Sequence, residues 1–478
     1  MYRLVLDYLL LLVGVAVAFS ALGSLSFNPL GLLFSALFLV AVSWAANEVF
    51  ARVYHVAVNN ESVIISALVL SLIITPARNL YDLPFFFWAA VWAAAGKFIL
   101  AFHKKHLFNP AALAVFLTAV FLGRSASWWV GSAFMFFPVL LGGWLIVRKT
   151  QREEMVGAFF LAAVLTILAL NFVNGPDLVT LLSKTFLETP LLFFGFVMLT
   201  EPLTTPLTKN LRLIYGALTG FLFAPQLHFG AVYFLPEQAL LLGNIFSFLV
   251  SSKDRLVLTL KERIPLGTDV YDFVFTGRGK FNYTAGQYLE WTLGHGSPDS
   301  RGVRRYFTLA SSPTENDLRL GVKFAENGSS FKKALLNLSS GGEISASSLA
   351  GDFTLPRDPN TKLAFLAGGI GITPFRSMIK SLLDMADRRN VVMVYAEKEG
   401  RDFLYRDIFS AAQNLLGLKT VYSSGRFGQD LIRREIPDYK ERLFYLSGPR
   451  AMVDSFQKIL LDLRVAKDRI KTDFFPGF

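Results

Sequence analysis

Cysteine is absent from this chain of 478 residues. Without thiolates the chain cannot bind a cysteine-ligated iron–sulfur cluster or a thiolate metal site, and it cannot form a disulfide. Charge is also scarce, because Asp, Glu, Lys and Arg together make up 17% of the residues. Hydrophobic residues make up 53%, including 46 phenylalanines, which is above the usage of soluble proteins. We therefore expect a large part of the chain to lie in a lipid bilayer.

The apolar residues are concentrated in residues 1–251. From Ser252 onward charges are denser, and alternating stretches such as LVLTLKERIPLGTDVYDFVF replace the long apolar runs, which indicates β-strands. The sequence predicts a domain boundary near SSKDR, residues 251–255. The formal net charge is +11, but many basic residues flank apolar runs and do not form one stripe with interleaved aromatics. Nucleic acid is therefore not an expected partner.

Ten apolar segments are predicted to cross the roughly 30 Å of hydrocarbon in a bilayer. They are residues 4–22, 30–50, 61–76, 84–102, 109–122, 129–147, 155–172, 186–202, 212–226 and 231–251. The first is expected to be a retained span, because no clear small-residue cleavage site follows it. The fifth and ninth are short and flanked by Pro and Asn, which is typical of half-helices or re-entrant segments; a tilted full helix is the alternative.

The Lys and Arg residues of the connecting loops predict the orientation. With ten spans and an inside N-terminus, only Arg78, Arg124 and Lys184 lie outside. The inside residues are Arg3, Arg52, Lys104, Lys105, Arg148, Lys149, Arg152, Lys209, Arg212, Lys253 and Arg255. This asymmetry predicts a multi-pass protein of the cytoplasmic membrane with its hydrophilic C-terminal half in the cytosol.

The stretch RRYFTLASSP, which begins at Arg304, combines residues that suit a flavin. The guanidinium of Arg305 can clamp a diphosphate, the ring of Phe307 can pack on a flat ring system, and the Thr308 hydroxyl can hydrogen-bond its edge. An amphipathic strand with an incidental arginine is the alternative. Downstream, GVKFAENGSSFKKALLNL places Gly328, Ser329 and Ser330 at a predicted helix start, which favours a phosphate, although a serine there is often only a cap.

The stretch KLAFLAGGIGITPFRSMIKSLLDMA is typical of a strand, a glycine turn and a helix, with Thr373 as cap and Pro374 at the first helical position. A single glycine-rich turn is weak evidence. Here it is followed in order by VVMVYAEKEGRDFLYRDIF, SSGRFGQD, LFYLSGPRAMVDSFQKIL and a terminal DFFPGF.

This order of motifs resembles the ferredoxin–NADP⁺ reductase family over roughly residues 256–478. The resemblance implies a six-stranded antiparallel β-barrel that binds FAD at 256–356, followed by a parallel α/β domain that binds NAD(P)H at 357–478. It implies FAD-binding roles for Arg305, Phe307 and Thr308, with Tyr288, Gly328, Ser329, Ser330 and the terminal Phe475 and Phe478 in support. It implies NAD(P)-binding roles for Gly368, Gly369, Gly371, Thr373, Pro374, Gly448, Pro449 and Met452.

Three points stay open within this resemblance. The family usually has Cys before the Gly-Pro pair, where this chain has Ser447, so the role of the thiol is in doubt. The loop AEKEGRD contains both Glu397 and Arg401, so the sequence does not decide between NADH and NADPH. The terminal phenylalanines have a disordered apolar tail as the alternative. Because hydride transfer belongs to the cofactors, no acid–base triad and no metal site are expected.

The N-terminal half has a resemblance of its own. KKHLFNPAALAVFL at 104–117 and FGFVMLTEPLTTPLTKNLRLIYGALTG at 194–220 resemble the B subunit of the sodium-translocating NADH:quinone reductase and the D subunit of the related Rnf complex (NqrB/RnfD). That family implies a polytopic helical domain at 1–251, with two related five-helix halves and bound flavin. The residues suggested for a membrane flavin are Asn109, Pro110, Thr200, Glu201, Pro202 and Thr205. Glu201 as a solvated charge at a helix end is the alternative.

The second flavin, FMN or riboflavin, is expected to be non-covalent, because the chain lacks the Ser-Gly-Ala-Thr type of stretch to which relatives attach FMN. Haem is not expected, because the histidines of this half, His55, His103, His106 and His228, do not form pairs deep inside spans. The sequence thus predicts an oxidoreductase that passes electrons from cytosolic NAD(P)H through FAD into the membrane domain, to quinone or an extracytoplasmic acceptor. A transport-type membrane module with a redox-sensing reductase domain is the alternative.

Overall fold

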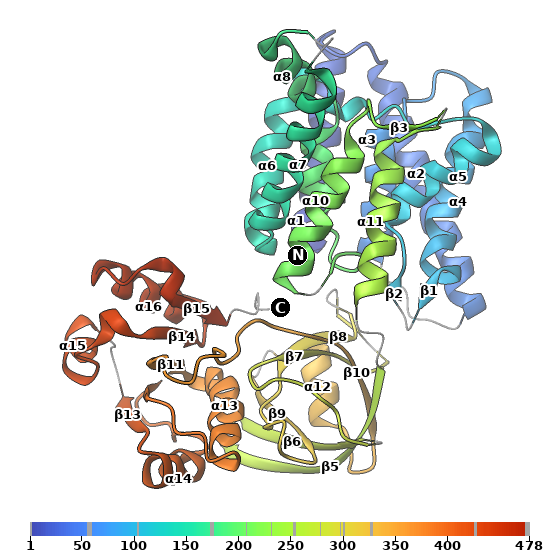
Figure 1. Cartoon of the computed structure of the whole chain (residues 1–478). Coiled ribbons are helices and arrows are strands. Elements are labelled where there is room, and N and C mark those ends of the chain that lie inside the picture. Colours follow the sequence, from blue (N-terminus) through green and yellow to red (C-terminus); the bar gives the residue numbers. More distant parts are fainter. Residues whose placement is uncertain are drawn as a thin grey trace. The chain divides into compact units, whose positions relative to one another are not determined.

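The computed structural model describes residues 2–473 apart from 55–59, 103–104, 173–175, 207, 231, 252–254, 278, 297, 300–301, 326–327 and 425–427. The chain divides into two compact units, Met1–Ser251 and Ser252–Phe478 (Figure 1). The first unit is helical and the second contains two sheets with helices.

The N-terminal unit is built from apolar helices. They are α1 (Tyr2–Ala21), α2 (Pro29–Tyr54), α3 (Asn60–Ile73), α4 (Leu83–Ile99), α5 (Pro110–Leu122), α6 (Phe136–Thr150), α7 (Glu153–Asn171), α8 (Leu178–Leu187), α9 (Leu191–Phe193), α10 (Lys209–Phe223) and α11 (Pro236–Val250). Helix α9 continues as a π-helical turn over Phe194–Met198. Buried Leu, Ala, Val and Phe side chains from most of these helices form one core.

The same packing arrangement of three helices, with a hairpin between the last two, occurs twice in this unit. In the first half α4 packs against α2 and α5, and a hairpin of β1 (Ala101–Phe102) and β2 (Lys105–His106) connects α4 to α5. In the second half α10 packs against α7 and α11, and a hairpin of β3 (His228–Phe229) and β4 (Val232–Tyr233) connects α10 to α11. The last two helices of each half are therefore joined in the same way.

The prediction of ten spans is wrong. Among the described residues, four helices are long and apolar enough to cross a membrane: Arg3–Ala21, Pro29–Tyr54, Ala133–Thr150 and Glu153–Asn171. A fifth is added if the pair Leu178–Leu187 and Leu191–Met198, bent by 57°, counts as one span. Several remaining helices are too short: α5 has 13 residues, or roughly 20 Å at 1.5 Å per residue, against about 30 Å of hydrocarbon.

The assignment of loops to the two sides of the membrane assumed ten spans, so the Lys and Arg count no longer fixes the orientation. With four spans the two ends of the unit lie on the same side, and with five they lie on opposite sides. Hydropathy in the sequence counts apolar residues but does not show where a proline or a bend divides a helix.

Two glycines of α10 allow this helix to lie directly against α7. A Cβ atom at Gly216 would lie 2.3 Å from the carbonyl oxygen of Met155, and one at Gly220 would lie 2.3 Å from that of Phe159. Residues four apart share one face of a helix, and small residues at this spacing let membrane helices approach closely. The glycines therefore set the contact between the two helices.

The C-terminal unit begins with an antiparallel sheet. Its strands are β5 (Arg255–Gly267), β6 (Val270–Gly277), β7 (Tyr288–Thr292), β8 (Arg304–Thr308), β9 (Leu318–Lys323) and β10 (Glu343–Ala350), in the order β8-β7-β10-β5-β6-β9. Helix α12 (Ser330–Leu336) buries Phe331 and Leu335 in the core that the sheet encloses. In the described residues β8 and β9 are the end strands, so the closed barrel that was expected is not shown. One backbone bond, from the Ala310 amide to the Arg319 carbonyl at 2.9 Å, links their ends.

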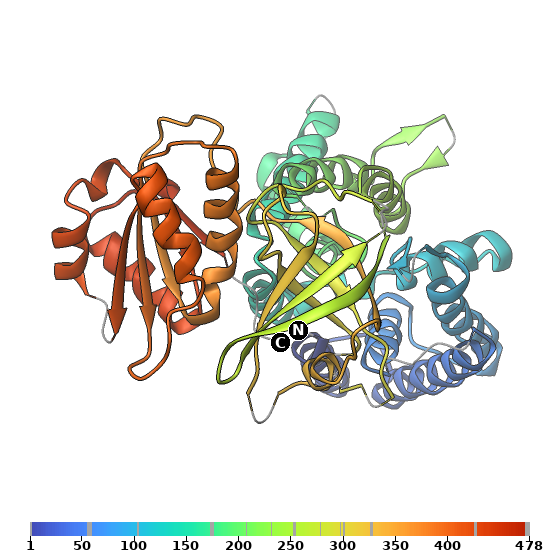
Figure 2. The ribbon, with the colours of Figure 1, turned by 90° about the horizontal axis from the view of Figure 1, so that it is seen from below.

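A parallel sheet follows in the order β13-β12-β11-β14-β15. Its elements are β11 (Leu363–Gly368), α13 (Thr373–Asp384), β12 (Val391–Glu397), α14 (Arg406–Leu416), β13 (Lys419–Ser424), α15 (Gln429–Glu435), β14 (Leu443–Ser447), α16 (Arg450–Asp462) and β15 (Ile470–Asp473). Helices cover both faces of this sheet (Figure 2). Alternate residues of β11 face the two layers: Phe365 packs with α13 and α14, and Leu366 packs with α15 and α16. This two-sided burial explains why β11 is apolar throughout.

Gly220→Ala is expected to lower the stability of the N-terminal unit by about 1–3 kcal/mol, because the added methyl group overpacks the contact with α7. Gly157→Ala is the matched control, because this α7 glycine has nothing within 4 Å of its Cβ position. The control is expected to be neutral or slightly stabilising. Thermal unfolding of the detergent-solubilised chain measures both, and equal effects of the two substitutions would contradict the proposed contact.

Candidate functional site

The glycine turn after β11 is pressed against the start of α16. A Cβ atom at Gly371 would lie 2.4 Å from the Gly448 amide nitrogen, and one at Gly368 would lie 2.1 Å from the Met452 sulfur. Gly369 has φ +53, a backbone conformation that favours glycine. The structure thus brings these predicted NAD(P)-binding residues together at the carboxyl ends of β11 and β14, where parallel α/β sheets bind ligands.

The helix after this turn begins one residue earlier than the sequence predicted. Thr373 is the first residue of α13 and makes no side-chain cap bond, so its predicted role as the cap is wrong. Pro374 lies in the first turn of α13, and the Thr373 hydroxyl donates to the Ile370 carbonyl at 3.2 Å. Pro449 occupies the position before α16. A long helix whose first amides lie at a glycine turn provides donors for a phosphate. These residues fit a dinucleotide pyrophosphate, because the three glycines of the turn add no side chains of their own between the ligand and the backbone.

The predicted FAD-binding residues of β8 divide between two faces. Opposite residues of an antiparallel pair share a face of the sheet. Tyr288 of β7 pairs with Thr308 of β8, so these two residues lie on one face. Phe307 and Arg305 lie on the other face, where the Phe307 ring is 5.9 Å from the Phe331 ring and the Arg305 guanidinium is 5.5 Å from it. Strand β8 therefore presents Arg305 and Phe307 to the start of α12.

An acidic residue that sequence reasoning missed lies between the expected phosphate ligands. The Asp299 carboxylate accepts from Arg305 Nη2 at 3.1 Å and from the Ser330 amide at 3.0 Å. The Ser330 hydroxyl accepts from the Asp299 amide at 2.9 Å. Ser329, whose hydroxyl accepts from the Lys332 amide at 3.3 Å, follows Gly328 and caps the helix. Arg305 is 6% exposed, and its guanidinium already pairs with the Asp299 carboxylate. A buried guanidinium paired with an anion is suited to bind a diphosphate.

A second missed residue, Asp473, connects the two sheets of the unit. Its carboxylate accepts from Thr308 Oγ1 at 3.5 Å and from Ser447 Oγ at 3.3 Å. Ser447 pairs with Asp473 in the register of β14 and β15, so the contact follows from strand pairing. Burial raises the pKa of the Asp473 carboxyl to about 7, against the opposing effect of the two hydrogen bonds. The DFFPGF motif, which begins with Asp473, was the available signal; Phe475 and Phe478 lie outside the described residues.

The two candidate residues for the adenosine ribose differ in their surroundings. The Glu397 carboxylate lies 3.7 Å from the Cβ position of Gly369 in the glycine turn. The Arg401 guanidinium instead pairs with the Asp269 carboxylate at 2.7 Å. Of these two residues, Glu397 is thus the one placed beside the turn.

The polar residues suggested for a membrane flavin take part in helix-end hydrogen bonds. Asn109 caps α5, where its side chain accepts from the amides of residues 111 and 112 at 3.1 Å, and its own amide donates to Asn244 Oδ1 at 2.8 Å. The Thr200 hydroxyl donates to the Phe196 carbonyl at 2.7 Å. A bound flavin would have to replace these bonds.

The remaining suggested residues lie near other helix ends. Pro110 is the first residue of α5, and Pro202 lies in the turn after Thr200. The Glu201 carboxylate accepts from the Thr204 hydroxyl at 3.3 Å, and the Thr205 hydroxyl accepts from Arg152. His55 and His103, which the sequence argues against as haem ligands, lie outside the described residues.

Comparison with known proteins finds sequence similarity that includes part of the C-terminal unit. Residues 365–458 match the family model of the oxidoreductase NAD-binding domain. Flavohemoprotein A of Dictyostelium discoideum is 24% identical over 243 residues, which cover 47% of this chain and 61% of that protein. A flavohemoprotein of Halalkalibacterium halodurans is 23% identical over 252 residues, 48% of this chain and 59% of that one. The reductase subunit of stachydrine N-demethylase of Rhizobium meliloti is 26% identical over 233 residues, covering 45% and 65%.

Among solved structures, the cytochrome P450 reductase GcoB of Amycolatopsis has a TM-score of 0.42 at 23% identity, covering 46% of this chain and 70% of that one. A flavohemoglobin of Malassezia yamatoensis, solved with bound FAD and haem, has a TM-score of 0.44 at 20% identity and covers 66% and 79%. The chain spans about six-tenths of the length of the two flavohemoproteins named above.

The C-terminal unit is thus similar to oxidoreductases that have this NAD-binding domain. These matches agree with the predicted enzyme class, an NAD(P)H-dependent oxidoreductase that contains FAD. The resemblance suggested for the N-terminal half and the individual site residues stay predictions.

Asp473→Asn is expected to change how stability depends on pH. An unfolded Asp titrates near pH 3.9, so between about pH 4 and the folded pKa of about 7 the folded state holds more protons here than the unfolded state. The contribution of Asp473 to the free energy of unfolding therefore falls as the pH rises toward 7. Thermal unfolding from pH 5 to 8 should show the wild type losing stability relative to the variant.

Asp454→Asn, at an exposed residue of α16, is the control for the loss of one negative charge. A difference between wild type and Asp473→Asn that stays constant from pH 5 to 8 would contradict the raised pKa.

Proposed function

We propose that this chain is a membrane flavoenzyme that takes electrons from cytosolic NAD(P)H, passes them to FAD and delivers them through the N-terminal unit to quinone or an extracytoplasmic acceptor. The division proposed is a membrane domain at 1–251, an FAD-binding domain at 256–356 and an NAD(P)-binding domain at 357–478. The observation that carries the proposal is Asp473, which joins Thr308 of the flavin strand to Ser447 beside the glycine turn. The two expected cofactor positions therefore meet at one carboxyl group.

The residues of the C-terminal unit have separate tasks in this proposal. Nicotinamide and flavin, when bound, supply the hydride chemistry. Arg305 compensates the charge of the FAD diphosphate, and Phe307 packs beside the ring system. Gly368 and Gly371 let the NAD(P)H pyrophosphate approach the backbone. Asp473, whose pKa is raised to about 7 by burial, can take up or release a proton near neutral pH, next to the hydroxyl groups of Thr308 and Ser447.

The membrane part of the proposal is supported by the apolar helices and by the repeated arrangement of the N-terminal unit. Four described helices can cross a bilayer, and the hairpins between α4 and α5 and between α10 and α11 are consistent with two related five-helix halves. We propose that a second, non-covalent flavin binds near Asn109 and Thr200, because electrons must cross about 30 Å of hydrocarbon to reach an external acceptor. Binding would exchange the helix-end bonds of these residues for bonds to the ring.

Arg305→Ala is expected to weaken FAD binding about 10- to 100-fold, the equivalent of a charge-assisted hydrogen bond of about 1.5–3 kcal/mol. Titration of the flavin-free protein with FAD, followed by flavin fluorescence, measures the Kd. Arg304→Ala is the matched control. The Arg304 guanidinium lies 3.5 Å from the Glu290 carboxylate, on the face of β8 opposite to Arg305. Equal FAD affinity in wild type and Arg305→Ala would remove the diphosphate clamp from the proposal.

The electron route is tested by flavin content and turnover. We expect the full-length protein to release more than one flavin per chain on denaturation, to show no haem Soret band and to oxidise NAD(P)H steadily when quinone is supplied. The fragment 256–478 should release one flavin. One flavin in both would exclude the internal relay and leave quinone reduction near FAD, whereas flavin reduction without steady turnover would favour the redox-sensing alternative.

A further inference from the structure

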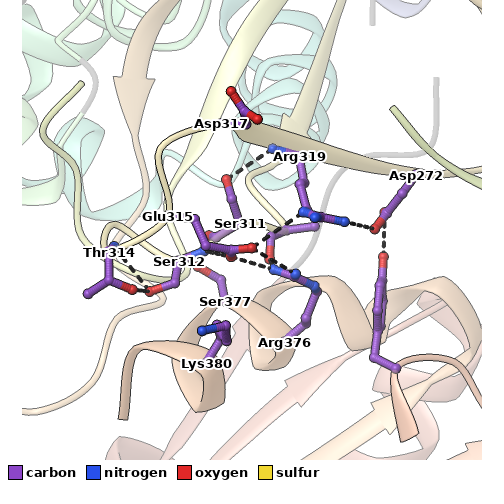
Figure 3. Close-up of polar contacts among 12 residues, drawn as sticks. Asp272, Ser311, Ser312, Thr314, Glu315, Asp317, Arg319, Arg376, Ser377 and Lys380 are labelled. Carbon is purple, nitrogen blue, oxygen red and sulfur yellow. Dashed lines mark hydrogen bonds and ion pairs between the residues drawn. The ribbon is translucent and has the colours of Figure 1, made fainter. Parts of the chain in front are cut away.

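A buried arginine of α13 faces the antiparallel sheet and not solvent. Arg376 lies in the first turn of the helix, three residues after Thr373, and is 3% exposed. In Figure 3 its guanidinium points to Glu315, in the loop that follows β8. This arginine was not among the residues that the sequence indicated, and neither of the proposed cofactor sites uses it.

The contact between Arg376 and the loop after β8 is bidentate. Nη1 donates to Glu315 Oε2 at 2.8 Å, and Nη2 donates to Glu315 Oε1 at 3.0 Å. Nη1 also donates to the Ala310 carbonyl at 2.6 Å. The next helical residue, Ser377, donates from its hydroxyl to the Ser311 carbonyl at 2.5 Å. Two successive residues of α13 therefore hold the loop, and a bidentate pair fixes orientation as well as distance.

A second set of contacts joins the antiparallel sheet to the start of α13 and to Tyr405, the residue before α14. Asp272 of β6, which is 1% exposed, accepts from the Tyr405 hydroxyl at 2.6 Å. The Arg376 guanidinium lies 5.4 Å from the Tyr405 ring. Strand β9 comes so close that a Cβ atom at Gly321 would lie 2.7 Å from Thr373 Cγ2. The antiparallel sheet and the start of α13 thus meet over several fixed contacts.

The position of this contact links the two proposed cofactor sites. Ala310 is two residues after Thr308, at the end of the flavin strand, and Arg376 is four residues after Ile372, at the end of the glycine turn. Both connections are short and buried, so a change in the Arg376 contact moves one site relative to the other. A buried ion pair adds little net stability compared with apolar residues of similar size. The pair is therefore more important for holding the two segments in a fixed geometry than for stability.

We propose that the Arg376–Glu315 pair is a positioning device that sets the distance between the nicotinamide and the flavin. The inference rests on the proposed NAD(P)H-to-FAD reaction and extends it to two residues that touch neither cofactor site. Hydride transfer requires the reacting atoms to be held about 3–3.5 Å apart, and a misplacement of about 1 Å can cost about 100-fold in rate. Loosening the pair therefore slows transfer without removing either cofactor.

The test compares Glu315→Gln and Arg376→Lys with wild type in the full-length protein loaded with FAD. Anaerobic stopped-flow mixing with NADH or NADPH gives the limiting rate of flavin bleaching and the Kd of the nucleotide. We expect both variants to lower the limiting rate about 10- to 100-fold, with the FAD content and the nucleotide Kd within about threefold of wild type. The charge-transfer absorbance of the nicotinamide–flavin complex should weaken in parallel.

Lys380→Gln is the matched control. This lysine lies on the same helix and pairs with Asp384, whose carboxylate also accepts from Thr314 of the loop. Lys380→Gln leaves the Thr314 bond and the Arg376–Glu315 pair in place, so it should leave the limiting rate unchanged. If Glu315→Gln does not fold, Glu315→Asp keeps the charge and shortens the side chain, and the same fall in rate is expected.

A wild-type limiting rate in both variants would overturn the inference. A fall in rate that only accompanies loss of FAD and a lower Tm would also overturn it, because the pair would then serve stability alone. If neither nucleotide reduces the flavin of the wild-type protein, the proposed function itself fails, and the positioning role fails with it. The three results are distinguishable in the same set of measurements.

Discussion

The backbone contact between Gly371 and Gly448 is the constraint on which the C-terminal unit depends. A side chain at Gly371 would collide with the Gly448 amide, so the turn after β11 and the turn after β14 can meet only as bare backbone. This contact fixes where α13 and α16 begin. It also places Ser447 next to the glycine turn, and through the register with β15 it brings Asp473 to the same edge. The expected nucleotide position and the carboxyl group beside it thus have a common origin.

The sequence predicted local features of this half well. The glycine turn, Pro374 and the serine cap at Ser329 are set by residues a few positions apart, and the structure contains each of them. Asp299 and Asp473 could not be found in this way, because they bind to residues far along the chain, Ser330 and Thr308, and because Asp473 meets Ser447 through strand pairing. The division of Tyr288 and Arg305 between two faces likewise depends on a pairing register that composition does not show.

The N-terminal half shows the opposite balance. Apolar composition predicted its general character, but the number of spans was wrong, because helix length depends on where Pro, Gly and bends interrupt an apolar run. The contacts that define the packing come from small residues, such as Gly216 and Gly220, and from helix ends, such as Asn109. A hydropathy count contains none of this information.

The ion pair between Arg305 and Asp299 bears on how a flavoprotein is made. A buried guanidinium without a counter-ion costs several kcal/mol, which a newly synthesised chain would have to bear until its cofactor arrived. Asp299 supplies the negative charge from within the chain. The sheet can therefore fold before FAD is available. If Arg305 binds the FAD diphosphate as proposed, cofactor loading exchanges one anion for another at the same guanidinium. Under the proposed function, folding and cofactor loading are in this way separate events.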